Sequence, residues 1–388
     1  MPKAHRKPAA VAELESAIVR TVQALGAISR IELARQLKLV ASTAGIYVDR
    51  LIEQGYLVER SKTTRGLGRP PVLLEIAPER GRFVGVDFDA RQIMAVAVDF
   101  AQQPLVRLRR TIPTRATVRR VLSLVEQLVA EVIGDSSSDV LGIGLGVPGP
   151  VDTKQGISRH YRFIRGWHDV AIGSQVAAEF GVPVEVENNS RSMALGELWC
   201  GEGRGRRDLV CLSIRSGIGT GVIVDGSLLG GAHNQAGEIG RWVYPLGGDR
   251  PRTIEDIASL TGILAAAHER RSTTSLRSAL RAVGGSLSVA DLLQAAEAGD
   301  SLATSLVREA AVVHGWIAHQ LVELLDPQRL IVAGPLVASD DYLAVLLDEA
   351  ARLGGEERRE MIARSTLGEW AAALGAAALA FHRWKPRR

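Results

Sequence analysis

The first side chains along the sequence that could bind a charged partner are basic and lie in a loop that contains glycines. Residues 61–70 read SKTTRGLGRP and carry Lys62, Arg65 and Arg69, with no helical or strand periodicity. Cationic groups on a loop tip suit DNA phosphates and the narrow, electronegative minor groove. A solvated hairpin loop can have the same composition, so this loop alone does not decide for DNA.

Two helices are predicted ahead of this loop. Apolar residues recur at helical spacing from Leu14 to Leu25, and Gly26 follows as a stop. A second helix is expected over residues 29–37, with Ser29 as its N-cap. Its side chains predicted to face inward are Ile31, Leu33, Ala34 and Leu37.

A third helix is predicted after a short turn at residues 38–41, ending near Gly55. Its predicted core face holds Ala44, Val48, Leu51 and Ile52. Its outward face, which a recognition helix would present to the major groove, holds Ser42, Thr43, Ile46 and Arg50. Residues 56–60 and 72–76 read as antiparallel strands around the basic loop. We therefore expect a winged helix-turn-helix over residues 1–78, although three-helix units also serve as protein-binding modules.

Charge is unevenly distributed along the 388 residues. Residues 1–82 hold 14 Lys and Arg against 8 Asp and Glu, whereas the whole chain holds 47 against 43. The head is thus basic and the remainder slightly acidic. This distribution predicts that a polyanion binds the head only, although ordinary surface charge is an alternative.

From residue 82 onward, strands alternate with helices, which indicates an α/β fold. Apolar strands are predicted at residues 83–88, 93–98, 105–112 and 140–147, with a helix over 117–133. A second set begins near Asp208 and includes strands at 209–213 and 330–333. We expect a first lobe over 79–200, a second over 201–367, and a C-terminal helix within 368–385 that returns to the first lobe.

Cysteine content and hydropathy limit the cellular setting. Cys200 and Cys211 form no CxxC pair, which argues against a zinc cluster and indicates a reducing compartment. The basic N-terminus has no apolar run after it, and the apolar stretch at 370–381 is too short for a membrane span. We expect a cytoplasmic protein with no membrane partner.

The body carries a series of motifs in a characteristic order. They read GRPPVLLEI, GVPGPVD, GW, VEN, ALGE, GIGTGVIVDG, AGEIG and LDP. Together they resemble the ROK family of repressors, open reading frames and sugar kinases. The resemblance implies a two-lobed actin/hexokinase-like (ribonuclease H-like) body with a sugar in the interlobe cleft. A ROK body behind a winged helix-turn-helix implies a transcriptional regulator, since the ROK kinases lack that head.

The resemblance also implies that kinase activity is lost. Where the family has a D-x-G-G-T-K phosphate loop, this chain has Asp87 to Gln92, with Asp89 in place of a glycine. Arg215 replaces the leading glycine of the second phosphate loop, residues 215–221. Asn189 stands where the family has its catalytic aspartate, and an amide cannot accept the hydroxyl proton. We expect no enzyme activity and no cofactor.

The family's zinc site is also missing from this sequence. Arg241 occupies the position of the family's histidine, and the following stretch to Glu255 contains no cysteine. Leu246, Gly248 and Thr253 lie near the expected thiolate positions. Since a closed zinc site needs four nitrogen or sulfur ligands, no metal is expected. His233 lies nearby as an isolated histidine.

The resemblance implies an effector site formed by Asn188, Asn189, Glu238, Arg241 and Glu255. Amides and carboxylates suit sugar hydroxyls, whereas a guanidinium at Arg241 favours a carboxylate or phosphate. We therefore expect a sugar or a sugar-derived effector, acidic or phosphorylated. Alternatively, Arg241 pairs with Glu238 or Glu255 and fills the cleft itself.

The expected partners are double-stranded operator DNA, a small-molecule effector and further copies of the chain. Repressors of this kind are dimers or tetramers, because paired heads match paired half-sites. Two other functions remain open from sequence: a sugar kinase with an added DNA-binding head, and a ligand-independent regulator whose body serves only to dimerise the heads.

Overall fold

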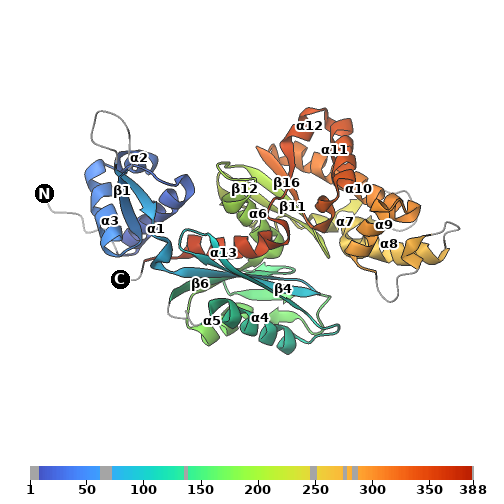
Figure 1. Cartoon of the computed structure of the whole chain (residues 1–388), viewed down its shortest axis with the longest axis horizontal. Helices are drawn as coiled ribbons and strands as arrows, with labels where there is room; N and C mark the ends of the chain where they lie inside the picture. The colour runs from blue at the N-terminus through green and yellow to red at the C-terminus, as the bar shows by residue number, and fades with distance from the viewer. Residues whose placement is uncertain are drawn as a thin grey trace.

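The computed structural model describes residues 8–61, 72–134, 139–244, 251–273, 278–281 and 287–386. A small N-terminal head lies at one end of a larger two-lobed body (Figure 1). The head consists of α1 (Pro8–Leu25), α2 (Arg30–Gln36), α3 (Ala41–Glu53), β1 (Leu57–Ser61) and β2 (Val72–Ile76). The two strands pair antiparallel, as a wing requires.

The head folds as its sequence predicts, with one exception. Ser29 caps α2, its hydroxyl accepting a hydrogen bond from the Glu32 backbone N–H. Leu33 is fully buried, but Ile31 is 74% exposed, so the prediction that Ile31 faces inward is wrong. Residues two apart on a helix lie about 200° around its axis, so Ile31 and Leu33 cannot share a face. The head's core residues are Ile18, Val19, Val22, Leu33, Val48, Leu51, Leu57 and Leu74.

The first lobe is a five-stranded sheet with helices on both faces. Its strands in spatial order are β10 (Val184–Asn188), β6 (Val140–Val147), β3 (Arg82–Phe88), β4 (Gln92–Asp99) and β5 (Pro104–Thr111). β10, β6 and β3 run parallel, and β4 and β5 continue antiparallel. Helices α4 (Val118–Ile133) and α5 (Ile172–Phe180) cover one face, and α13 (Ala371–Arg383) covers the other (Figure 1).

A small three-stranded sheet extends this lobe toward the cleft. It consists of β7 (Val151–Asp152), β8 (Ile157–His160) and β9 (His168–Val170). Trp167 is buried beneath it and donates its indole N–H to the Ser158 hydroxyl at 2.8 Å. The sheet thereby fixes the loop of residues 161–166 at the mouth of the cleft.

The second lobe has a second five-stranded sheet, in the order β13 (Ser227–Leu228), β12 (Ile218–Val224), β11 (Leu209–Ile214), β16 (Arg329–Ala333) and β17 (Ile362–Arg364). Its helices are α6 (Asn189–Cys200), α7 (Ile254–Ala258), α8 (Leu260–Thr273), α9 (Val289–Glu297), α10 (Ser301–Leu325), α11 (Asp340–Gly354) and α12 (Glu357–Met361). The two-residue strands β14 (Val243–Tyr244) and β15 (Arg252–Thr253) form a separate pair. Single 3₁₀ turns are η1 (Pro78–Arg80), η3 (Ile239–Arg241), η4 (Ala279–Arg281), η5 (Pro335–Ala338) and η6 (Gly368–Trp370).

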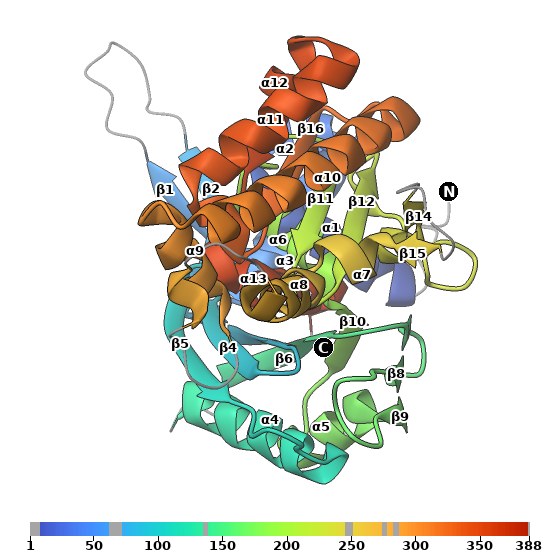
Figure 2. The ribbon, with the colours of Figure 1, turned by 90° about the vertical axis from the view of Figure 1, so that its right-hand side faces the viewer.

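Helices α6 and α13 lie between the two sheets, with the second lobe above and the first below (Figure 2). They cross at unusually close range because glycines meet backbone there. A Cβ on Gly375 would overlap the Ser192 carbonyl oxygen, and a Cβ on Gly196 would overlap that of Ala371. α13 is almost entirely buried, which explains its alanine-rich sequence. In the described part of the chain, no helix has the length and hydropathy to span a bilayer.

Candidate functional site

The outward face of α3 is the first candidate site. Ser42, Ile46 and Arg50 are exposed and Thr43 is half-buried, while Ala44, Val48 and Leu51 on the opposite face are buried. Ile46 is 61% exposed, so its side chain is accessible on this face of α3. Lys62, Arg65 and Arg69, the predicted wing contacts, lie outside the described residues.

Arg50 differs from the other residues of this face because it already has a partner. Its guanidinium donates a 2.9 Å hydrogen bond to the carboxylate of Glu15, which is almost completely buried. It also lies 5.6 Å from the centre of the Tyr47 ring. Arg50 therefore ties α3 to α1, and Tyr47 is a further half-buried residue of this helix that the sequence analysis did not single out.

The second candidate site is a cavity of about 380 Å³ between the two lobes. All five predicted effector residues line it: Asn188, Asn189, Glu238, Arg241 and Glu255. They come from the start of α6, from η3 and from the start of α7. The fold thus brings together residues that are up to 67 positions apart in the sequence.

Asn188 serves the fold rather than the cavity. Its side-chain oxygen caps α6 by accepting hydrogen bonds from the backbone N–H groups of Ser190 at 2.9 Å and Arg191 at 3.3 Å. Its amide nitrogen donates to the Gly149 carbonyl at 3.0 Å. Because these bonds use both ends of the amide, little of its capacity remains for a ligand. Asn189, the next residue, makes a single long contact of 3.5 Å to the Phe88 carbonyl.

The charged groups of the cavity are paired, although loosely in one case. Arg241 is 62% exposed on its side chain and lies 3.8 Å from Glu238, so it does not fill the cleft. Glu255 pairs instead with Arg162 of the first lobe, at 2.9 Å. Burial raises the pKa of Glu255, and the charge of Arg162 opposes that rise. Of the two pairings considered for Arg241, only the one with Glu238 occurs.

Residues 161 and 162 connect the two lobes across the cavity mouth. The Tyr161 hydroxyl lies 3.3 Å from the hydroxyl of Ser216 in the second lobe. Burial raises the pKa of Tyr161 to about 12. Sequence reasoning missed Tyr161, Arg162 and Ser216, because only the folded chain shows that this loop reaches the opposite lobe.

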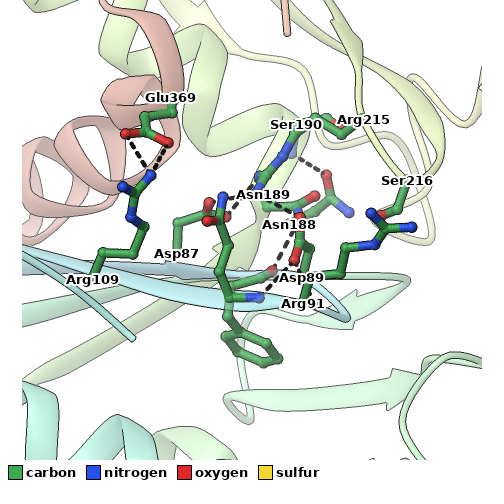
Figure 3. A network of polar contacts seen from close by, with 12 residues as sticks. Asp87, Asp89, Arg91, Arg109, Asn188, Asn189, Ser190, Arg215, Ser216 and Glu369 are labelled. Carbon is green, nitrogen blue, oxygen red and sulfur yellow. Dashed lines mark hydrogen bonds and ion pairs between the residues drawn. The ribbon is translucent and has the colours of Figure 1, made fainter. Parts of the chain in front are cut away.

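At the base of the cleft, Arg215 forms a buried ion pair with two aspartates (Figure 3). Its guanidinium nitrogens lie 3.0 and 2.8 Å from the two carboxylate oxygens of Asp87, and 3.4 Å from Asp89. The Asp87 side chain is fully buried, and that of Arg215 is 12% exposed. Burial raises the pKa of Asp87, whereas Arg215 acts to lower it. Burial alone would lower the pKa of Arg215, but the aspartates outweigh it and raise that pKa.

This ion pair connects the two segments, Asp87 to Gln92 and residues 215–221, that the resemblance compares with phosphate loops of the kinases. The sequence analysis identified Asp89 and Arg215 as separate obstacles to phosphate but did not predict their pairing. Their opposite charges were the available signal, since a buried anion needs a cation beside it.

No group of three or more His, Cys, Asp or Glu side chains suited to a metal occurs among the described residues. Arg241 and Thr253, at two of the positions compared with the zinc ligands, lie on η3 and β15. Leu246 and Gly248 lie outside the described residues. Cys200 and Cys211 are free thiols.

Comparison with known proteins assigns the family. Residues 83–383 match the family described as the ROK family. The chain belongs to the ROK family. This ROK chain is 27% identical over 345 residues to the DNA-binding transcriptional repressor Mlc of Escherichia coli, a match covering 87% of this chain and 84% of Mlc.

Other ROK relatives include both enzymes and repressors. A glucokinase of Halalkalibacterium halodurans is 33% identical over 218 residues, or 54% of this chain and 65% of the glucokinase. A xylose repressor of Caldicellulosiruptor bescii is 30% identical over 226 residues, or 58% of this chain and 56% of the repressor. The matches thus span less than two thirds of either relative.

Solved ROK structures confirm the predicted fold class, a winged helix-turn-helix joined to a two-lobed body. A ROK family transcriptional regulator, described as a homolog of E. coli Mlc, superimposes with a TM-score of 0.78 at 22% identity over 96% of each chain. A ROK glucokinase from Streptomyces griseus, in complex with glucose and AMPPNP, superimposes with a TM-score of 0.69 at 28% identity. That match covers 77% of this chain and 99% of the glucokinase.

Proposed function

We propose that this protein is a DNA-binding transcriptional repressor whose kinase-like body is catalytically inactive and senses a sugar or sugar-derived effector. The proposal rests on one observation: the chain combines a helix-turn-helix head with a body whose cleft contains the Arg215–Asp87–Asp89 ion pair. A regulator needs the head and the cleft but not phosphoryl transfer. The repressor names of Mlc and of the xylose repressor support the assignment as a transcriptional repressor.

Catalytic inactivity follows from three side chains. Phosphoryl transfer requires backbone amides around the phosphates and a carboxylate that accepts the hydroxyl proton. Asn189 offers an amide instead of that carboxylate. Arg215 and Asp89 place a bulky ion pair between the lobes, where the phosphate loops of the family would be. Losing a positioned general base alone costs about 10²–10⁴-fold in rate.

The cavity suits a polyol with an acidic group. Glu238, Glu255 and Asn189 supply acceptors and a donor for hydroxyls, and a volume of about 380 Å³ is sufficient for a monosaccharide. Arg241 is exposed and held only at 3.8 Å by Glu238, so it can turn toward a carboxylate or phosphate. We include a sugar acid or sugar phosphate in the proposal as the effector class, and a dimer or tetramer as the form that binds DNA.

The experiment is a fluorescence-anisotropy titration of the full chain with a duplex from the region upstream of its own gene. It is repeated with neutral sugars, sugar acids and sugar phosphates. Nanomolar binding that one compound class weakens supports the whole proposal. Binding that no compound alters supports a ligand-independent regulator, and the absence of any specific, salt-sensitive binding contradicts the assignment as a repressor.

A further inference from the structure

The head is docked on the end of the C-terminal helix. The Ser16 hydroxyl of α1 donates to the Trp384 carbonyl at 3.0 Å, and Arg20 of α1 donates to the His382 carbonyl at 3.0 Å. Lys385 pairs with Glu13 at 2.9 Å. Figure 1 shows the C-terminal end of α13 beside α1. The orientation of the head therefore depends on the position of α13.

An aromatic cluster reinforces this contact. Tyr56 of the head has its ring centre 4.8 Å from that of Trp384 and 5.4 Å from that of Phe100. Phe100 follows β4 of the first lobe and lies 5.0 Å from Trp384. One apolar core thus includes the head, the first-lobe sheet and α13, so the head is not an independent unit on a flexible linker.

The other end of this connection is the effector cleft. α6 begins with Asn188 and Asn189 at the cavity and ends at Cys200, 12 residues later. Near its end, Trp199 stacks on His382 of α13, with ring centres 3.6 Å apart and planes inclined by 15°. α6 is thus in contact with the cavity at one end and with the helix that holds the head at the other.

The α6–α13 contact is close along its length. Backbone meets backbone at Gly196 and Gly375, where an added Cβ would overlap a facing carbonyl oxygen. Burial, with the nearby charges of Arg20 and Arg383, lowers the pKa of His382 to about 3. The ring is therefore neutral at physiological pH and stacks on Trp199 as an apolar surface.

We propose that Trp199, His382 and Arg20 are positioning residues that set the orientation of the DNA-binding head according to the state of the interlobe cleft. The connection runs from Asn189 through α6 to Trp199, then through His382 to Arg20 of α1. The inference rests on the proposed function, since it assumes that the head binds DNA. It concerns a physical coupling, however, which can be measured without DNA or effector.

The test uses Arg215→Gln to perturb the cleft, because this change removes the interlobe ion pair. Hydrogen exchange of the full chain is measured by mass spectrometry for α1 and α3 of the head, at amides that exchange by local opening rather than by global unfolding. We expect Arg215→Gln to change exchange rates in the head by about fivefold or more, the lower range of typical allosteric coupling. In an Arg20→Gln background the same change should alter head exchange less than about twofold, while α6 still responds.

Three controls make the outcome specific. Arg352→Gln removes a more exposed arginine ion pair, with Glu349, outside this connection, and should leave the coupling intact. Trp199→Phe keeps an aromatic ring and should retain most of the coupling, whereas Trp199→Ala should abolish it. Thermal melts identify any variant that fails to fold.

The proposal is overturned if Arg215→Gln leaves the head unaffected, or if its effect on the head persists undiminished with Arg20→Gln. Duplex affinity is measured in parallel on the same variants. Loss of DNA binding in every protein, with intact exchange coupling, would contradict the proposed function but not the coupling. Intact DNA binding with no exchange coupling would contradict the coupling but not the proposed function.

Discussion

Arg215 and Asp87 are 128 residues apart in the sequence and form a buried ion pair between the second and first lobes. Such pairs fix geometry more than they add stability, because desolvation of both charges offsets much of their attraction. In this protein the pair joins the two lobes at the base of the cleft. It also joins the two segments on which the proposed loss of kinase activity rests.

Arg215→Gln should destabilise the protein by about 3 to 5 kcal/mol at pH 8, because it leaves Asp87 buried without its cation. Without Arg215 the pKa of Asp87 rises further above its value in the unfolded chain. The deficit should therefore shrink as the pH falls and Asp87 takes up a proton. Urea unfolding at pH 8 and pH 5 measures both effects. A deficit equal at the two pH values would contradict an uncompensated Asp87 charge.

His314 should make stability depend on pH. Its ring is fully buried between the Ala258 carbonyl, 3.0 Å from Nε2, and the Tyr342 hydroxyl, 2.7 Å from Nδ1. Burial lowers the pKa of His314 to about 4, so the unfolded chain binds its proton first as the pH falls below about 6.5. The contribution of neutral His314 to the free energy of unfolding is complete above pH 6.5 and is lost as the pH falls toward 4.

Between pH 7 and pH 5 we expect His314 to account for about 2 kcal/mol of lost unfolding free energy. His314→Gln should reduce the pH dependence by that amount, while His382, whose pKa is also lowered, keeps its own contribution. Urea titrations of both proteins at the two pH values test this. If the variant loses as much stability as the parent, His314 is not a source of the dependence.

Ile46→Glu should weaken duplex binding at least about tenfold, since it places a negative charge on the outward face of α3 near DNA phosphates. Ile46 is exposed, so the stability should change by less than about 0.5 kcal/mol. Val224→Glu is the matched control, an exposed apolar residue on β12 of the second lobe. Anisotropy at several salt concentrations measures both variants. If Ile46→Glu binds the duplex with the same affinity as the parent protein, α3 is not part of the DNA interface.

Asn189→Asp should not restore a sugar kinase. The substitution supplies the missing carboxylate, but the proposed function also rests on Arg215 and Asp89, which it leaves in place. A coupled assay with ATP and a panel of hexoses should detect no turnover above that of the parent. Sugar phosphate formed by Asn189→Asp would show that the base alone was lacking.

Gly375→Ala should destabilise the protein by about 3 kcal/mol, the upper range for overpacking, because its Cβ would overlap the Ser192 carbonyl. Ala378→Gly, at a buried position of the same helix, is a comparison that adds no volume. Denaturant midpoints of the two variants give the measurement. A Gly375→Ala protein as stable as the parent would mean that α6 and α13 can separate at little cost.

The sequence predicted the elements better than their contacts. Local patterns located the three head helices, the wing strands and both sheets, because helical periodicity and buried apolar strands depend on neighbouring residues. Ile31 was misassigned because apolar character was given more weight than its angle around the helix. The partners of Arg215, Glu255 and His382 could not be predicted, since they lie on other elements and only the folded chain brings them together.

The sequence predicted which residues line the candidate site but not what each of them does there. All five proposed effector residues line one cavity, yet Asn188 is a helix cap and Glu255 is held by Arg162 from the other lobe. A family resemblance indicates which positions line the cleft. It does not indicate how those side chains pair, because the pairing depends on residues elsewhere in the chain. In this chain the resemblance did not imply the pairing of Arg215 with Asp87 or that of Arg162 with Glu255.

The docking of Trp384 against Tyr56 has a consequence for synthesis on the ribosome. Chains emerge from the N-terminus, so the head is complete more than 300 residues before Trp384 is made. Until then the Tyr56 face of the head has no α13 to cover it. A nascent or truncated chain therefore exposes this apolar surface to solvent. Only a chain synthesised as far as Trp384 can cover this surface.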